Sequence, residues 1–170
     1  MAGDHGATEI FPGLWLGSYK TIQDPEFMAD IDVVFNCTKN LPMVFNKKSF
    51  RLPVDDNLQK VEIDMMSSLA AEIVFHIHNE YATNRKRVLI HCYAGRQRSA
   101  AVVAMYLIFI YGLTPRDAVT FIRSRRPEAF AGGVNFLESI SRFRRDFSNR
   151  CKTARMVHNI RVPIAIGASV

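Results

Sequence analysis

Residues 88–100 combine residue types and a spacing that favour catalysis. The segment reads Val88-Leu-Ile-His-Cys-Tyr-Ala-Gly-Arg-Gln-Arg-Ser-Ala100, so five residues separate Cys92 from Arg98, and the hydroxyl of Ser99 follows directly. A short loop between a strand and a helix turns its backbone N–H groups inward and forms a nest for a tetrahedral anion. Arginine adds a planar fork that grips two phosphate oxygens at once. This order of residues predicts a cysteine nucleophile in a phosphate-binding loop.

The flanking residues predict the two elements that hold this loop. Val88 to Ile90 is a short apolar run typical of a buried strand, and the longer apolar run from Ala100 to Tyr111 is typical of a buried helix. That run is too short to span a bilayer. The N-terminus of the helix would place free N–H groups and a positive potential at the loop. Cysteines in such surroundings have pKa values of roughly 3.5–7.5 instead of about 8.5, which favours the thiolate.

The rest of the chain predicts further strands and helices around this centre. Alternating apolar residues about a Pro-Gly turn predict a hairpin over 10–18, and β-rich runs predict strands over 31–38 and 50–54. Apolar residues at helical spacing predict a helix over 63–81. Strands with intervening helices, and a strand–loop–helix at the centre, indicate an α/β fold with one core sheet.

Two more helices are expected in the second half of the chain. Thr114 followed by a proline and then Asp117 is a typical helix start, with a cap, a proline in the first turn and an early acid. Phe136, Ile140 and Phe143 recur on one side of a last helix, together with Phe147. These elements would complete the helical layer against the sheet.

Length and composition indicate one globular, intracellular domain. The chain has 170 residues, of which 48% are hydrophobic, enough for a single core. Its three cysteines, Cys37, Cys92 and Cys151, are widely spaced and odd in number, so they predict neither a disulfide framework nor a zinc site. With no apolar leader at the N-terminus, this pattern predicts a reducing compartment, the cytoplasm first and the nucleus second.

The net charge of +6 is unevenly distributed. Residues 1–90 carry a net charge of −3, whereas residues 91–170 carry +9. The half that contains Cys92 is therefore the basic half. This distribution favours an anionic substrate and would steer one toward the loop.

The segment around Cys92 resembles the His-Cys-x5-Arg-Ser/Thr signature of cysteine-dependent protein tyrosine phosphatases, and within them the dual-specificity (VH1-like) branch. The opening Ile10-Phe-Pro-Gly-Leu-Trp-Leu-Gly-Ser18 also resembles the entry hairpin of that branch. The resemblance covers roughly residues 9–147. It implies a compact protein tyrosine phosphatase-like fold, a single central mixed sheet flanked by helices. Residues 1–8 would then be a loose N-terminal arm, and residues 148–170 a basic, then apolar, C-terminal tail whose Val162-Pro-Ile-Ala-Ile-Gly stretch has no predicted partner.

The resemblance also implies roles for residues of the signature. Cys92 would attack phosphorus and become a cysteinyl-phosphate, while Ser99 would hydrogen-bond the thiolate and assist its departure. His91 would orient the loop backbone. Neither a metal nor a cofactor is implied. The phosphate-binding loop would comprise His91, Tyr93, Ala94, Gly95, Arg96, Gln97 and Arg98.

A general acid must protonate the leaving oxygen, and the resemblance implies Asp56. Asp56 closes the run Leu52-Pro-Val-Asp-Asp56, as similar enzymes end a strand with Ile-Pro-x-x-Asp. Asp55 is the alternative by position. Asp64 is a third candidate, although it stands where an acid in the first turn of a helix is expected.

Three features depart from the family pattern. Gln97 replaces the small residue commonly found before the arginine, Arg96 adds a cation as in phosphoinositide phosphatases, and the region after Arg126-Pro127 lacks the family's second proline. These departures leave the outer wall of the pocket undefined. They do not touch the residues of the expected chemistry.

The resemblance implies a metal-independent phosphatase that hydrolyses phosphotyrosine and phosphoserine/threonine in phosphorylated proteins. An RNA 5′-triphosphatase or a phosphoinositide phosphatase on the same scaffold is the alternative, which the basic half and Arg96 favour. A phosphate-binding module without turnover is a third reading. The presence of Cys92, Arg98, Ser99 and Asp56 together argues against it. The oligomeric state has no signal in the sequence.

Overall fold

A five-stranded mixed sheet forms the centre of the molecule. The computed structural model describes residues 6–158, with side chains described through residue 149. The strands follow the order β1-β2-β5-β3-β4, in which β1 and β2 are antiparallel and the other neighbours are parallel. Their bounds are β1 Ala7–Phe11, β2 Leu14–Gly17, β3 Val33–Asn36, β4 Lys48–Arg51 and β5 Val88–His91. The mixed sheet predicted from the resemblance is confirmed.

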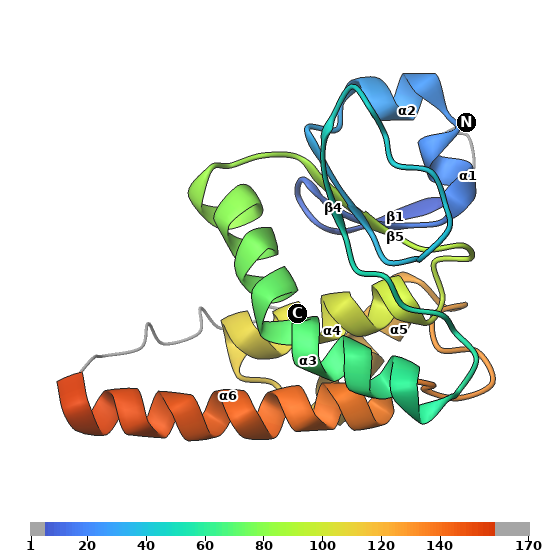
Figure 1. The fold of residues 1–170 in the computed structure, drawn as a ribbon. Coiled ribbons are helices and arrows are strands. Elements are labelled where there is room, and N and C mark those ends of the chain that lie inside the picture. Colours follow the sequence, from blue (N-terminus) through green and yellow to red (C-terminus); the bar gives the residue numbers. More distant parts are fainter. Residues whose placement is uncertain (1–5, 159–170) are drawn as a thin grey trace.

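Helices cover both faces of this sheet (Figure 1). Two short ones, α1 and α2, lie on one face, and the four long ones, α3 to α6, lie on the other. Their bounds are α1 Tyr19–Ile22, α2 Pro25–Ala29, α3 Lys60–His78, α4 Arg98–Tyr111, α5 Pro115–Arg125 and α6 Leu137–His158, with a π-helical turn η1 Asn79–Thr83 after α3. Alternate residues of β3 divide accordingly, since Val33 and Phe35 join the large core while Val34 joins the smaller cluster under α2.

The strand and the helix that flank the signature are the most deeply buried elements. All of β5 is buried, and so is α4 from Ser99 to Ile108. Helix α4 ends where Gly112 adopts a left-handed conformation, φ 65°, which closes the helix at little cost for a glycine. Helix α5 begins with the predicted cap, because the Thr114 hydroxyl accepts the N–H of Asp117 at 3.1 Å. The signature loop is therefore flanked by two buried elements, β5 and α4, that hold its ends in place.

Of the described helices, none alone combines the length and the apolar composition needed to cross a membrane. Helices α4 and α5 meet those two criteria only as a pair, with a bend of 118° between them.

Several predicted boundaries differ from the structure. Strand β1 begins at Ala7, so Ala7 and Thr8 pair with β2 instead of belonging to a loose arm. Strand β4 ends at Arg51 and not at residue 54, since the proline at 53 has no N–H to donate to a sheet.

A further difference is at the C-terminal boundary. Helix α6 continues past residue 147 to His158 because neither glycine nor proline interrupts residues 137–158. The predicted tail therefore starts inside a helix. Residues 1–5 and 159–170, including the apolar stretch of the tail, lie outside the described residues.

Candidate active site

Cys92 lies between the end of β5 and the start of α4, at the carboxyl edge of the parallel strands. Ligands of open α/β sheets bind at this edge. The side chain is only 2% exposed. The hydroxyl of Ser99, in the first turn of α4, donates to Sγ of Cys92 at 3.1 Å. Burial and this hydrogen bond are consistent with the predicted role of Cys92 as a nucleophile.

The carbonyl groups of the signature loop point outward and are held by the surrounding scaffold. The carbonyl of Tyr93 accepts the N–H of Tyr19 at 2.9 Å, and the carbonyl of Arg96 accepts the N–H of Phe130 at 2.8 Å. Gly95 O accepts Nε of the buried Arg126 at 2.9 Å. The outward face of the loop is thus fixed by α1, by α5 and by the segment after α5.

The N–H groups of the same loop have no such partners. Within the described part of the chain, none of the backbone N–H groups from Tyr93 to Arg98 donates a hydrogen bond to another protein group. Successive N–H groups turned to one side form an anion-binding nest, and the N-terminus of α4 adds its positive potential. The loop can therefore surround the oxygens of a phosphoryl group next to Cys92.

Gly95 allows this loop to lie close to the sheet. Its φ is +65°, and a Cβ at this position would stand 2.6 Å from the carbonyl oxygen of Gly17 in β2. No other residue type fits such an approach without displacing the loop. Both the conformation and the contact require glycine here.

Arg98 reaches back across the site to the chain after β4. Its Nη1 donates to the carbonyl of Val54 at 3.2 Å, which anchors one edge of the guanidinium. Its Nε is buried and has no hydrogen-bond partner among the described residues. The guanidinium is therefore fixed in place and still has donors to offer a phosphate.

His91 is fully buried beneath the loop. Its Nδ1 lies 3.4 Å from the carbonyl oxygen of Cys92, a contact that can orient the loop backbone. Burial lowers the pKa of His91 to about 4, so the ring is neutral near neutral pH. A neutral imidazole at this position orients the backbone without adding charge to the site.

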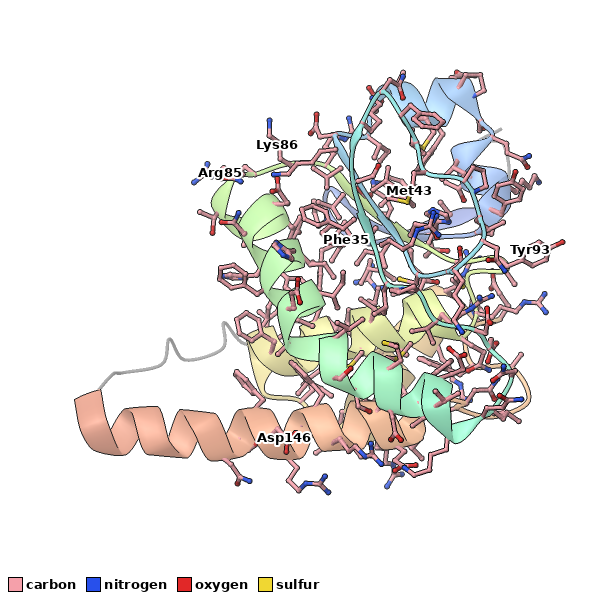
Figure 2. The ribbon with its side chains drawn as sticks, in the orientation of Figure 1. Phe35, Met43, Arg85, Lys86, Tyr93 and Asp146 are labelled. Carbon is pink, nitrogen blue, oxygen red and sulfur yellow. The ribbon has the colours of Figure 1, made fainter. Side chains whose placement is uncertain are left out.

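The outer residues of the loop face solvent. Tyr93 is 65% exposed and projects from the edge of the molecule (Figure 2), where its ring stacks on Tyr19 at a centroid distance of 6.5 Å. Tyr19 also lines an apolar cavity of about 340 Å³ with Met43 and Phe45. Arg96 is exposed as well. The entrance of the site thus combines aromatic surface with one cation.

The three candidate acids have different partners. Asp55 forms an ion pair with Lys39 at 3.2 Å. Asp64 is bound by Lys60 and by Arg142, and these contacts lower the pKa of its carboxyl, with Arg142 the larger cause. The lowered pKa makes Asp64 a poor proton donor, and the carboxylate of Asp55 is engaged by a cation.

Asp56 alone of the three has a neutral partner for its side chain, the Nδ2 of Asn135 at 2.8 Å from Oδ1. It is also solvent-exposed, as a group that meets a substrate must be. Its environment therefore suits the role of general acid better than those of Asp55 and Asp64. Its approach to the leaving oxygen stays a prediction.

A buried carboxylate supports the segment that carries these acids. Glu62, in the first turn of α3, is 5% exposed and accepts the N–H of Asp55 at 2.9 Å as well as the ammonium of Lys39. These two bonds lower the pKa of Glu62, the bond from Lys39 more strongly. Glu62 is therefore an anion that fixes the backbone immediately before Asp56.

Several residues of the site have no signal in the sequence as functional residues. The sequence marks Arg126 only as part of a family pattern and marks neither Asn135 nor Glu62. Arg126 and Asn135 contact the site from more than thirty positions away along the chain, and Glu62 contacts it through its carboxylate alone. No local periodicity marks such contacts. In the described residues, no three His, Cys, Asp or Glu side chains are grouped as a metal site.

Comparisons with known proteins find a family match and several relatives. The family described as "Dual specificity phosphatase, catalytic domain" matches residues 14–146. Mouse dual specificity protein phosphatase 8 is 28% identical over 145 residues, which are 82% of this chain and 21% of that protein. Mouse dual specificity protein phosphatase 2 is 33% identical over 127 residues, which are 71% of this chain and 38% of that protein.

These matches span well under half the length of either relative. Among solved structures, that of a mouse putative dual specificity phosphatase complexed with zinc tungstate superposes with a TM-score of 0.73 at 20% identity, covering 89% of this chain and 94% of that one. At that level of identity the likeness establishes the fold.

Proposed function

Because this chain belongs to the dual specificity phosphatase family, we propose that it hydrolyses phosphate monoesters on proteins through a cysteinyl-phosphate intermediate. The observation that carries the proposal is the polarity of the signature loop. Its carbonyls are bound by the scaffold on the outside, while its N–H groups, Arg98 and the Ser99-bonded sulfur of Cys92 are left for a phosphoryl group. A cradle of this kind stabilises the charge that develops on the transferring phosphoryl oxygens.

In the first step, the thiolate of Cys92 attacks phosphorus. A sulfur–phosphorus bond forms as the bond to the leaving oxygen breaks, and Asp56 gives its proton to that oxygen. The N–H groups of residues 93–98 and the guanidinium of Arg98 hold the equatorial oxygens. The products are the dephosphorylated side chain and the cysteinyl-phosphate.

In the second step, water attacks the phosphorus of the intermediate. Asp56, now a carboxylate, accepts a proton from this water as the sulfur–phosphorus bond breaks. The Ser99 hydroxyl donates to the sulfur at 3.1 Å and so stabilises the departing thiolate. Inorganic phosphate leaves and the free enzyme is restored, with no metal or cofactor required.

The substrate class we propose is phosphotyrosine and phosphoserine/threonine in proteins. The aromatic and apolar surface around Tyr19 and Tyr93 supports a peptide substrate, since these side chains can pack on residues next to the phosphorylated one. The exposed Arg96 is the feature that would favour an RNA triphosphate end or a phosphoinositide. The free, buried thiols of Cys37 and Cys92 support an intracellular setting, the cytoplasm or the nucleus.

A substrate panel tests this proposal. Phosphotyrosine and phosphothreonine peptides, triphosphate-ended RNA and phosphoinositides are compared by kcat/KM, each with and without EDTA, and Cys92→Ser serves as the inactive control. We expect phosphopeptides to be hydrolysed fastest, EDTA to have no effect and Cys92→Ser to be inactive. A higher kcat/KM for RNA or lipid would change the substrate class. Turnover by Cys92→Ser would remove the proposed mechanism.

A further inference from the structure

Asp56 lies on an exposed loop, yet its side chain has a fixed direction. Two hydrogen bonds hold the backbone just before Asp56. The carbonyl of Val54 accepts a hydrogen bond from Arg98 at 3.2 Å, and the N–H of Asp55 donates to Glu62 at 2.9 Å. These two bonds do not determine the rotamer of the carboxyl group, which would otherwise be free in solvent.

Asn135 supplies the missing constraint. Its Nδ2 donates to Oδ1 of Asp56 at 2.8 Å. In a protonated carboxyl group the carbonyl oxygen is the better acceptor, so an N–H donated to Oδ1 favours the acidic proton on the other oxygen. Asn135 therefore sets both the orientation of the carboxyl group and the oxygen from which a proton is delivered.

Asn135 is held in turn by the signature loop. Its backbone N–H donates to Oε1 of Gln97 at 3.1 Å, and Nε2 of the same glutamine donates to the carbonyl of Gly133 at 2.7 Å and to that of Ala131 at 3.3 Å. Gln97 is 7% exposed and immediately precedes Arg98. Every polar atom of its side chain is thus used to bind the segment that carries Asn135.

The conformation of that segment is unfavourable without these bonds. Gly132 and Gly133 have φ values of 82° and 127°, which cost a glycine little, whereas the φ of 58° at Phe130 is rare for an aromatic residue. Such a backbone persists only where its surroundings hold it in place, and it is found preferentially at functional sites. Here the bonds from Gln97 and from the carbonyl of Arg96 to Phe130 N–H hold it against the loop.

We propose that Gln97 and Asn135 are positioning residues that tie the general acid Asp56 to the phosphate-binding loop. The connection runs from the loop through Gln97 to the backbone of Asn135, and through its amide to the carboxyl group. It places the proton donor at a constant distance from the phosphoryl group that the loop binds. The proposal rests on the proposed function, in which Asp56 protonates the leaving oxygen.

The test uses two aryl phosphates that differ in how much their leaving group needs a proton. Phenyl phosphate has a basic leaving group, whereas p-nitrophenyl phosphate has a less basic one. We expect Asn135→Ala to lower kcat for phenyl phosphate by roughly 10- to 100-fold, the range for a misplaced catalytic group, with KM little changed. The loss with p-nitrophenyl phosphate should be clearly smaller.

Gln97→Met, which keeps the side-chain volume without its polar atoms, should show the same pattern. Asn57→Ala is the matched control, because Asn57 is the neighbour of Asp56 and, among the described residues, its side chain accepts only the N–H of Gln59. Its kcat should equal that of the wild type for both substrates.

A double variant separates positioning from general damage. If Asn135 acts through Asp56, then Asp56→Asn combined with Asn135→Ala should be no slower than Asp56→Asn alone. Additive losses, or equal losses with both leaving groups, would overturn the proposal and leave the acid assignment intact. If Asp56→Asn itself kept wild-type kcat with phenyl phosphate, the acid assignment would be wrong, and the positioning role would be wrong with it.

Discussion

At the scale of single residues, the site uses geometry more than charge. Arg98 is held by Val54 O and presents the remaining edge of a planar fork, and Ser99 gives one hydrogen bond to Cys92. His91 is buried and neutral, so it can support the loop without a charge of its own. Each role depends on the shape of a functional group, which makes conservative substitutions informative.

Replacement of Arg98 by lysine should be nearly as harmful as its replacement by alanine. Lysine keeps the positive charge but cannot contact two phosphate oxygens in one plane. We expect both variants to lose roughly 10²–10³-fold in kcat, as when a donor to the transition state is removed. Steady-state kinetics with one aryl phosphate decides this. Near-normal kcat in Arg98→Lys would show that only charge is needed.

His91 should make the stability of the fold depend on pH. In the unfolded chain a histidine has a pKa of about 6.5, whereas in the folded protein burial lowers that of His91 to about 4. Above about pH 6.5 the ring is neutral in both states and contributes nothing. As the pH falls from about 6.5 to about 4, His91 binds a proton in the unfolded chain but not in the folded protein. The free energy of unfolding should therefore drop by about 3 kcal/mol.

Urea denaturation at several pH values within this window measures the effect. The His91→Gln variant is the control, because it cannot titrate, and its stability should change less with pH over the same range. Parallel curves for the variant and the wild type would mean that His91 is not the residue responsible.

At the scale of elements, the site depends on how closely the signature loop approaches the sheet. Gly95 and Gly112 provide a matched pair for this, since both have a φ of +65°. A Cβ on Gly95 would meet Gly17 O at 2.6 Å, whereas a Cβ on Gly112 would meet no atom within 4 Å. The pair therefore separates the cost of a left-handed residue from the cost of moving the loop.

Gly112→Ala should lower the free energy of unfolding by about 1–2 kcal/mol, the cost of alanine in a left-handed conformation, and should leave kcat/KM unchanged. Gly95→Ala should show the same loss of stability and should also displace the loop, which should lower kcat/KM by about tenfold or more. Thermal unfolding and steady-state kinetics of both variants check the prediction. Equal activity in the two variants would contradict the tight fit of the loop.

The elements around the signature could be predicted from the sequence because their signals are local. The loop, β5 and α4 lie within one contiguous run, and the cap at Thr114 is a four-residue pattern. The ends of β4 and α6 were predicted wrongly, although the proline at 53 and the absence of glycine and proline from residues 137–158 are also local signals.

The contacts of Arg126 and Asn135 were also not predictable. They join segments that only the folded chain brings together, through hydrogen bonds that impose no periodic pattern on the sequence. The predicted nucleophile and its loop could therefore be named from the sequence, whereas the residues that contact the loop from distant segments could not.

At the scale of the whole molecule, the uneven charge should affect how substrates arrive. Residues 91–170 carry a net charge of +9 and include the signature loop. If this field steers acidic phosphopeptides, added salt should lower their kcat/KM, because exposed charges are screened within about 10 Å at moderate ionic strength. Peptides with neutral flanking residues, and p-nitrophenyl phosphate, should change little. An equal salt effect on all substrates would rule out steering.

The central claim is that phosphate passes through the sulfur of Cys92. The most direct measurement is a rapid acid quench during turnover of a phosphopeptide, followed by mass spectrometry of the segment that contains Cys92. The account predicts phosphate on Cys92 in the wild type and none in Cys92→Ser, which should also be inactive. Turnover without a phosphorylated Cys92, or phosphate found on another residue, would contradict it.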